Sequence, residues 1–135
     1  MKGTLVDSNV LLDILTNDSH WFALSASALE RYANEGLLYI NPVIYAEISV
    51  SFNTIEELED AVPAETLIRL PLPLEAAFLA GKAFRRYRQQ GGLRTSTLPD
   101  FFIGAHAAVA GLSLLTRDAS RYRTYFPTVN ILAPS

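Results

Sequence analysis

The segment TLVDSNVLLDIL, residues 4–15, contains the pattern that decides the fold. Residues 4–7 form a short apolar run with a β-branched centre, which predicts a buried strand that ends at Asp7. Apolar side chains then recur at positions 10, 11, 14 and 15, which is the spacing of an amphipathic helix. A buried strand that leads directly into a helix is the repeating unit of a parallel sheet covered by helices.

The rest of the chain repeats this unit. Further strands are expected at residues 37–41, 66–71, 112–116 and 128–134, and further helices at 20–36, 42–52, 54–62, 73–90, 97–111 and 119–126. Pro42 and Pro73 suit the first turn of their helices, and Gly36 and Gly111 suit the position after a helix end. The alternation predicts an α/β fold with a central, mainly parallel sheet of four to five strands and helices on both faces.

The composition fits a single domain, residues 1–135, because half of the side chains (50%) are hydrophobic. The apolar runs are short and interrupted by Asp, Glu, Pro or Gly, so none is expected to span a bilayer. Asp7 and Asp13 interrupt the N-terminal segment and no small-residue cleavage site follows, which argues against a signal peptide. The absence of cysteine excludes disulfides and cysteine-based sites and fits a cytoplasmic protein.

The positive charges of the chain are clustered, although the formal net charge is −3. That net charge argues against a general nucleic-acid coating protein, which is usually basic. One cluster contains Arg85, Arg86, Arg88 and Arg94, and a second contains Arg117, Arg121 and Arg123. The ordinary interpretation of both clusters is a solvated helix surface.

Two aspartates stand where a predicted strand ends and a helix begins. Asp7 ends the first strand, and Asp118 follows the strand at 112–116 in the sequence TRD. Ligand sites in open α/β sheets gather at the carboxyl ends of the strands. Each aspartate also has an ordinary explanation as a helix N-cap, a position that favours Asp. Because Ser8 or Asn9 could cap the first helix equally well, a cap does not require Asp7.

Two further acids lie on predicted helices. Glu47 shares a helix face with Val43 and Val50, so its carboxylate is either extended to solvent or partly buried. Burying an unpaired charge costs several kcal/mol, and a divalent cation with its preference for oxygen ligands would remove that cost. Asp100 occupies the third helical position after Thr97. The spacing imitates a capping box in which Asp is expected to reach back poorly, while the helix dipole favours an acid there.

Taken together, the four acids fit one arrangement. A parallel sheet can bring strand ends and helix starts to a common edge. Four carboxylates gathered there without counter-ions would repel one another, so the cluster predicts bound Mg²⁺ or Mn²⁺. Removing these four of the 14 acids leaves 10 against 11 Lys and Arg, which suits a polyanionic substrate. Asp13 lies off the helical face of Asp7 and is not expected to belong to the site.

Four segments of the chain carry a family resemblance: LVDSNVLLDIL, VIYAEI, LPDFFIGAHAAVAGLSLLTRD and RYRTYFP. Together they resemble PIN-domain ribonucleases, and more closely the VapC-type toxins of bacterial toxin–antitoxin systems. No single motif is specific, but their order, spacing and total length are. The resemblance implies a PIN-like fold and a metal-dependent endoribonuclease in which Asp7, Glu47 and Asp100 match the three central acids and Asp118 matches the more variable fourth.

The resemblance also implies cofactors, partners and supporting residues. Asn9 and Thr116 match polar residues that support the site in such proteins. Carboxylate-held Mg²⁺ or Mn²⁺ would activate a water molecule for attack on the phosphorus of RNA. The implied partners are the RNA substrate, a second copy in a homodimer and a small antitoxin that blocks the site. Arg85, Arg86, Arg88 and Arg94 are candidates for contact with the RNA backbone, the antitoxin or the dimer partner.

Two alternatives to this function remain open. One is a catalytically silent α/β binding module whose acids are only helix caps. The other is a metal-independent ribonuclease that uses His20 and His106 as an acid–base pair. His106 lies inside an apolar helix and is expected to be a packed or hydrogen-bonded core residue, whereas His20 is expected at the periphery. The chain has neither a GxGxxG nor a GxxxxGK[ST] segment, so no dinucleotide or P-loop signature is present.

Overall fold

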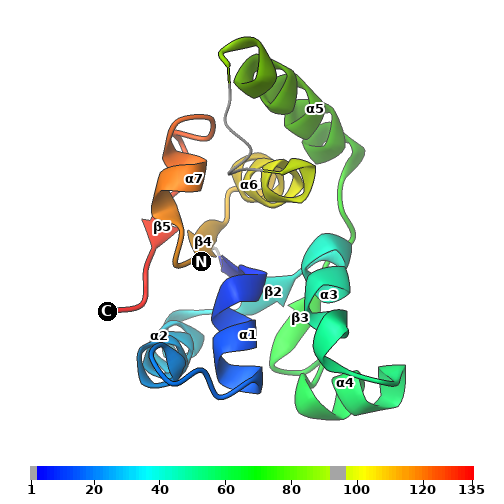
Figure 1. Ribbon diagram of the computed structural model, residues 1–135, viewed down its shortest axis with the longest axis vertical. Helices are drawn as coiled ribbons and strands as arrows, with labels where there is room; N and C mark the ends of the chain where they lie inside the picture. Colours follow the sequence, from blue (N-terminus) through cyan, green and yellow to red (C-terminus); the bar gives the residue numbers. More distant parts are fainter. Residues whose placement is uncertain (1–2, 92–96) are drawn as a thin grey trace.

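The computed structural model describes residues 3–91 and 97–135 and contains a five-stranded parallel sheet with the order β3-β2-β1-β4-β5 (Figure 1). The strands are β1 (Thr4–Val6), β2 (Leu38–Ile40), β3 (Leu67–Arg69), β4 (Ser113–Leu115) and β5 (Ile131–Leu132). The central strand is β1, in which Leu5 pairs with Tyr39 of β2 and with Leu114 of β4. The predicted α/β class with a mainly parallel sheet is confirmed.

Helices cover both faces of the sheet. They are α1 (Ser8–Leu15), α2 (Phe22–Glu35), α3 (Pro42–Ile48), α4 (Ile55–Ala61), α5 (Leu74–Gln89), α6 (Leu98–Ala110) and α7 (Ala119–Arg123). Figure 1 shows α1 to α4 on one side of the strands and α5 to α7 on the other. The chain moves from β1 to β3 in one direction and from β3 to β5 in the other, so right-handed crossovers place these two sets of helices on opposite faces. The neighbouring strands β1 and β4 send their following connections in opposite directions, to β2 and to β5, and ligand crevices form at such a point of the sheet.

The ends of several elements differ from the sequence prediction. The strand predicted at 128–134 is reduced to Ile131–Leu132, and the helix predicted at 42–52 ends at Ile48 and continues as a 3-10 turn, Ser49–Ser51. Gly111 ends α6 with a left-handed φ of 68°, as predicted. Gly36 does follow α2, but its φ of 174° is extended, so this helix end does not need a glycine for its backbone conformation.

The core lies between the sheet and both helical layers, and the middle of α6 is buried in it. Phe101 and Gly104 are buried on α6, and the ring of Phe126 packs directly against Gly104. His106 is 1% exposed, and its Nδ1 atom lies 3.0 Å from Nδ2 of Asn41. Burial lowers the pKa of His106, which confirms the predicted core histidine. Among the described residues, no helix is both long and apolar enough to cross a bilayer.

Candidate active site

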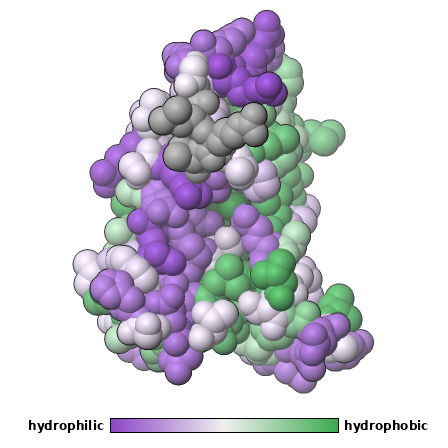
Figure 2. Space-filling model, in the orientation of Figure 1, coloured by the Kyte–Doolittle hydropathy of each residue, from purple (hydrophilic) through white to green (hydrophobic). Residues whose placement is uncertain are grey.

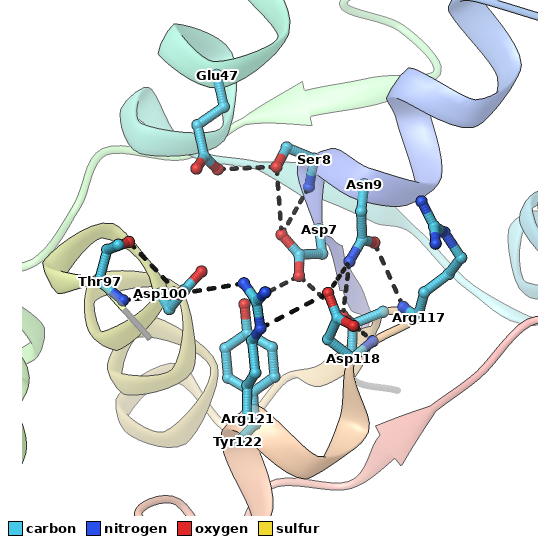
Figure 3. Close-up of polar contacts among 11 residues, drawn as sticks. Asp7, Ser8, Asn9, Glu47, Thr97, Asp100, Arg117, Asp118, Arg121 and Tyr122 are labelled. Carbon is cyan, nitrogen blue, oxygen red and sulfur yellow. Dashed lines mark hydrogen bonds and ion pairs between the residues drawn. The ribbon is translucent and has the colours of Figure 1, made fainter. Parts of the chain in front are cut away.

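The four predicted acids lie around one region at the carboxyl edge of the sheet, where β1 and β4 end (Figure 3). Asp7 directly follows β1, and Asp118 follows β4 by a short loop. Glu47 projects from α3, and Asp100 projects from the first turn of α6. The structure therefore brings together side chains from four separate parts of the chain, as the sequence predicted.

Asp7 is the most deeply buried of these acids, with 4% of its surface exposed. Its Oδ2 accepts hydrogen bonds from Thr116 Oγ1 at 2.8 Å and from the Tyr122 hydroxyl at 2.9 Å. Its Oδ1 accepts from the backbone N–H of Ser8 at 2.7 Å. A capping carboxylate usually bonds the second or third N–H of the helix, so this bond to the first one does not make a standard cap. Burial raises the pKa of Asp7 in spite of the three donors, because ionising a carboxyl group away from water is costly.

Glu47 is half-buried and is tied to Asp7 through Ser8. The Ser8 hydroxyl donates to Glu47 Oε1 at 2.8 Å and lies 3.5 Å from Asp7 Oδ1. Burial raises the pKa of Glu47, and the negative charges of Asp7 and Asp100 raise it further. The three carboxylates are therefore close enough to influence one another, and their common environment favours a bound positive charge.

Asp100 makes the capping box that its short side chain was expected to make poorly. Its Oδ2 accepts from the backbone N–H of Thr97 at 3.0 Å and lies 3.4 Å from the Thr97 hydroxyl. The expectation of poor reach was thus wrong, because the extended backbone of Thr97 (φ −115°, ψ 164°) directs its N–H to the carboxylate. Within residues 3–91 and 97–135, every side-chain hydrogen bond of Asp100 involves Oδ2, and Figure 3 shows the other oxygen directed away from Thr97.

Asp118 is held by the two predicted supporting residues. Asn9 Nδ2 donates to Asp118 Oδ2 at 3.1 Å and to Thr116 Oγ1 at 3.3 Å. The backbone N–H of Asp118 donates to Thr116 Oγ1 at 3.0 Å, so Thr116 joins this loop to Asp7. The Asp118 side chain makes no capping bond to α7, so the alternative explanation as an N-cap does not account for it.

The oxygen donors present are chemically suited to a hard divalent cation. Among residues 3–91 and 97–135, hydrogen bonds use one oxygen each of Glu47, Asp100 and Asp118 and leave the second oxygen of each free for a ligand. In the same residues no three acidic or histidine side chains already converge at ligand distance from one point. The donor set fits Mg²⁺ or Mn²⁺ in kind, and ligation of one ion by three of these acids needs side-chain movement.

Several residues of this site were not predicted from the sequence. Ser8 and Tyr122 contribute the hydroxyl groups around Asp7, and Arg121 reaches toward Asp100 and Asp118. The only sequence signal for Arg121 is its position three residues after Asp118, on a short helix beside the acids. The contact of Tyr122 has no signal in the sequence, because it depends on how α7 is rotated against the sheet.

The second arginine cluster is not a uniform solvated surface, contrary to the sequence interpretation. Arg117 makes two hydrogen bonds to Asp13, from Nε at 2.8 Å and from Nη2 at 3.0 Å, and stacks over the ring of Trp21 at 4.8 Å. Asp13 is 3% exposed and also accepts from Ser25 Oγ at 2.7 Å. Arg121 and Arg123 are both exposed, but Arg121 lies beside Asp100 and Asp118, so the interpretation holds in full only for Arg123. Asp13 lies outside the group of site acids, as predicted.

The first arginine cluster lies on the exposed end of α5. Arg85, Arg86 and Arg88 are exposed, and Figure 2 shows hydrophilic residues gathered over this end of the helix. Arg86 lies over the ring of Tyr125 at 5.7 Å. These three arginines make no hydrogen bond or ion pair with the four acids in the part of the chain that the structure describes. Arg94, the fourth predicted member, lies outside the described residues.

Comparison with known proteins agrees with this fold. The family described as PIN domain matches residues 4–127. No curated protein matches the chain in sequence. The chain is similar in structure to VapBC2 from Rickettsia felis, solved bound to a DNA fragment from its promoter, with a TM-score of 0.74, 15% identity and 98% of each chain covered.

Two further solved structures show the same likeness. FitAcB from Neisseria gonorrhoeae matches with a TM-score of 0.70, 18% identity and 97% of each chain covered. A toxin–antitoxin complex from Klebsiella pneumoniae matches with a TM-score of 0.72, 20% identity and 98% of each chain covered. At such identities the likeness establishes a shared fold over nearly the whole length of the chain.

Proposed function

Because this chain belongs to the PIN-domain family, we propose that it is a metal-dependent endoribonuclease that acts as the toxin of a toxin–antitoxin pair. PIN domains are in general nucleases. The observation that carries the proposal is the gathering of Asp7, Glu47, Asp100 and Asp118 around one region at the carboxyl edge of the sheet, with the Ser8 hydroxyl between Asp7 and Glu47. Such a group of acids is stable in its ionised form when a cation is bound between its members.

Asp7, Glu47 and Asp100 would hold Mg²⁺ or Mn²⁺, and Asp118 would complete the set. When bound, a divalent cation supplies a Lewis acid for the phosphate and lowers the pKa of a water molecule that attacks phosphorus. The protein's own contribution is orientation. Thr116, Tyr122 and Ser8 fix both oxygens of Asp7, and the N-terminus of α6 favours the ionised form of Asp100.

The proposed partners are RNA in the cytoplasm, a small antitoxin protein and a second copy of this chain. The similar structures include VapBC2 from R. felis bound to promoter DNA and a toxin–antitoxin complex from K. pneumoniae, which supports an antitoxin partner. Large apolar side chains remain exposed on α5 and after α3, where Leu74 is 84%, Phe78 69% and Val50 80% exposed. Figure 2 shows a hydrophobic edge on the side of α5, which suits burial by a protein partner.

Cleavage of host RNA in the presence and absence of metal tests the proposal. We expect cleavage with Mg²⁺ or Mn²⁺ and its loss in EDTA, with recovery when the metal is restored. Cleavage that survives EDTA would contradict a metal-dependent mechanism. No cleavage with either metal would favour a silent binding module.

The antitoxin proposal has a separate test in cells. Expression of the chain should arrest growth, and co-expression of the short reading frame next to its gene should restore growth. The two proteins should then co-elute, and light scattering of the purified chain should give twice the monomer mass. Growth arrest that the neighbouring frame does not relieve would contradict the pairing.

A further inference from the structure

Arg121 places a positive charge among the acids of the site. Its Nη1 lies 3.4 Å from Asp100 Oδ2, and its Nε lies 3.8 Å from Asp118 Oδ2. Figure 3 shows the guanidinium group between these two carboxylates, on the side of the site that faces Asp7. One side chain therefore spans two acids that come from different helical segments, α6 and the start of α7.

Among the described residues, Arg121 is the cationic side chain that forms ion pairs with the site acids. The other nearby arginine, Arg117, is committed to the buried Asp13. Arg121 thus partly neutralises the same carboxylates that a divalent cation would neutralise.

We propose that Arg121 is an internal counter-ion that competes with the divalent cation for Asp100 and Asp118 and, when the cation displaces it, binds a phosphate of the RNA. This inference rests on the proposed nuclease function. A divalent cation beside Asp100 would repel the guanidinium group electrostatically. The released side chain remains anchored on α7 beside the site, and a guanidinium group can bond two phosphate oxygens at once.

The ion pairs of Arg121 are weak enough for a divalent cation to displace its side chain. The side chains of Arg121 and Asp118 are each 41% exposed, and that of Asp100 is 13% exposed. The Arg121–Asp118 pair is open to water on both sides, and such pairs are weak and are screened by salt. The arginine can therefore reduce the affinity for the cation without preventing its binding.

Titration calorimetry of the metal-free chain with Mn²⁺ tests the competition. Arg121→Gln should bind Mn²⁺ about three- to tenfold more tightly than the wild type, because a competing charge has been removed. Arg123→Gln is the matched control, because it removes the same charge from the same helix and Arg123 forms no ion pair in the described part of the chain. Its Mn²⁺ affinity should stay within about twofold of the wild type. Melting curves in EDTA establish that both variants are folded.

The outcomes separate this inference from the proposed function. A wild-type chain that binds no Mn²⁺ would overturn the proposed metal site and this inference with it. A wild-type chain that binds Mn²⁺, with equal or weaker binding by Arg121→Gln, would overturn the inference alone. An equal gain in Arg123→Gln would also overturn it, because the effect would then be one of general charge.

The phosphate contact is tested by fluorescence anisotropy with a 2′-O-methyl RNA oligonucleotide, which resists cleavage. At saturating Mn²⁺, Arg121→Gln should weaken binding about five- to tenfold, and Arg123→Gln should weaken it less. In EDTA, where Arg121 pairs with the acids, the difference between Arg121→Gln and the wild type should shrink. Equal RNA affinity of Arg121→Gln and the wild type with Mn²⁺ present would overturn the phosphate role.

Discussion

At the scale of single residues, the two carboxylate oxygens of Asp100 have separate roles, one in the structure of the helix and one in the proposed chemistry. Oδ2 accepts from Thr97 and faces Arg121, whereas Oδ1 makes no hydrogen bond in the described residues. The capping box and a metal-binding role are therefore compatible at one position. The helix dipole contributes to both, because it favours the ionised carboxylate that each of them uses.

Replacement of Asp100 by Asn separates the two roles. Asn keeps an oxygen that can accept from Thr97, so the free energy of unfolding should change by no more than about 1 kcal/mol. The lost charge should reduce RNA cleavage at least about 100-fold, because loss of groups that serve a metal site costs activity on this scale. Single-turnover cleavage and urea unfolding measure the two effects.

The exposed Asp60 on α4 provides the control for Asp100→Asn. Asp60→Asn makes the same change of charge at an exposed position that forms no ion pair in the described residues, and it should leave cleavage within about twofold of the wild type. If Asp100→Asn instead unfolds the chain while activity per folded molecule stays unchanged, the acid serves only as a helix residue.

The acids of the site could be predicted from the sequence because their positions follow from local patterns. Asp7 and Asp118 follow short apolar runs, and the topology of a parallel sheet brings such points together. Arg121 and Tyr122 could not be assigned in the same way. A helix as short as α7 (Ala119–Arg123) has too few residues for periodicity to show which side faces the acids.

At the scale of elements, α6 positions Asp100 by close packing of its central turn. A Cβ atom at Gly104 would overlap the ring of Phe126, which is itself 2% exposed. The small residues Gly104, Ala107 and Ala108 are typical of a helix that packs closely against its neighbours. The partner of Gly104 could not be predicted, because Phe126 follows α7 and reaches α6 only in the folded chain.

Replacement of Gly104 by Ala should therefore destabilise the chain by about 1–3 kcal/mol, the usual cost of overpacking a core. Gly81 in α5 is the matched control, since a Cβ atom there meets nothing within 4 Å. Gly81→Ala should stabilise the chain by about 0.5–1 kcal/mol, because Gly is a poor residue for a helix interior. Urea unfolding of both variants checks the opposite signs. Two changes of the same sign would show that helix propensity, and not packing, decides the result at Gly104.

At the scale of the whole molecule, the N-terminal helices are tied to the C-terminal part of the chain by the ion pair of Asp13 and Arg117. Arg117 lies in the loop that carries Thr116 and Asp118, and its backbone N–H donates to Asn9 Oδ1 at 3.3 Å. Asp13 on α1 also bonds Ser25 on α2. The pair therefore holds α1, α2 and the loop after β4 in a fixed relation.

The parallel sheet could be predicted from the alternation of strands and helices, but this ion pair could not. Asp13 appeared from its helical position to lie apart from the site, and Arg117 appeared to belong to a solvated surface. Their contact joins residues 104 positions apart, and no local pattern encodes it. The ion pair of Asp13 and Arg117 nevertheless affects the site, because the loop that it restrains holds Asp118 against Asn9.

Replacement of Arg117 by Gln should destabilise the chain by about 3 kcal/mol, because it leaves the carboxylate of Asp13 buried without its counter-ion. Arg31→Gln is the matched control. Arg31 pairs with Glu35 on the surface of α2, where the two side chains are 67% and 58% exposed, and such pairs contribute no more than about 0.5 kcal/mol.

A second substitution tests the cause of the Arg117 effect. Asp13→Asn in the Arg117→Gln background removes the unpaired charge, so the double variant should recover more than half of the lost stability in urea unfolding. Equal stability of the single and double variants would show that the loss comes from the stacking of Arg117 on Trp21 and not from the charge of Asp13. The recovery thus decides whether charge or packing joins the two ends of the molecule beside the site.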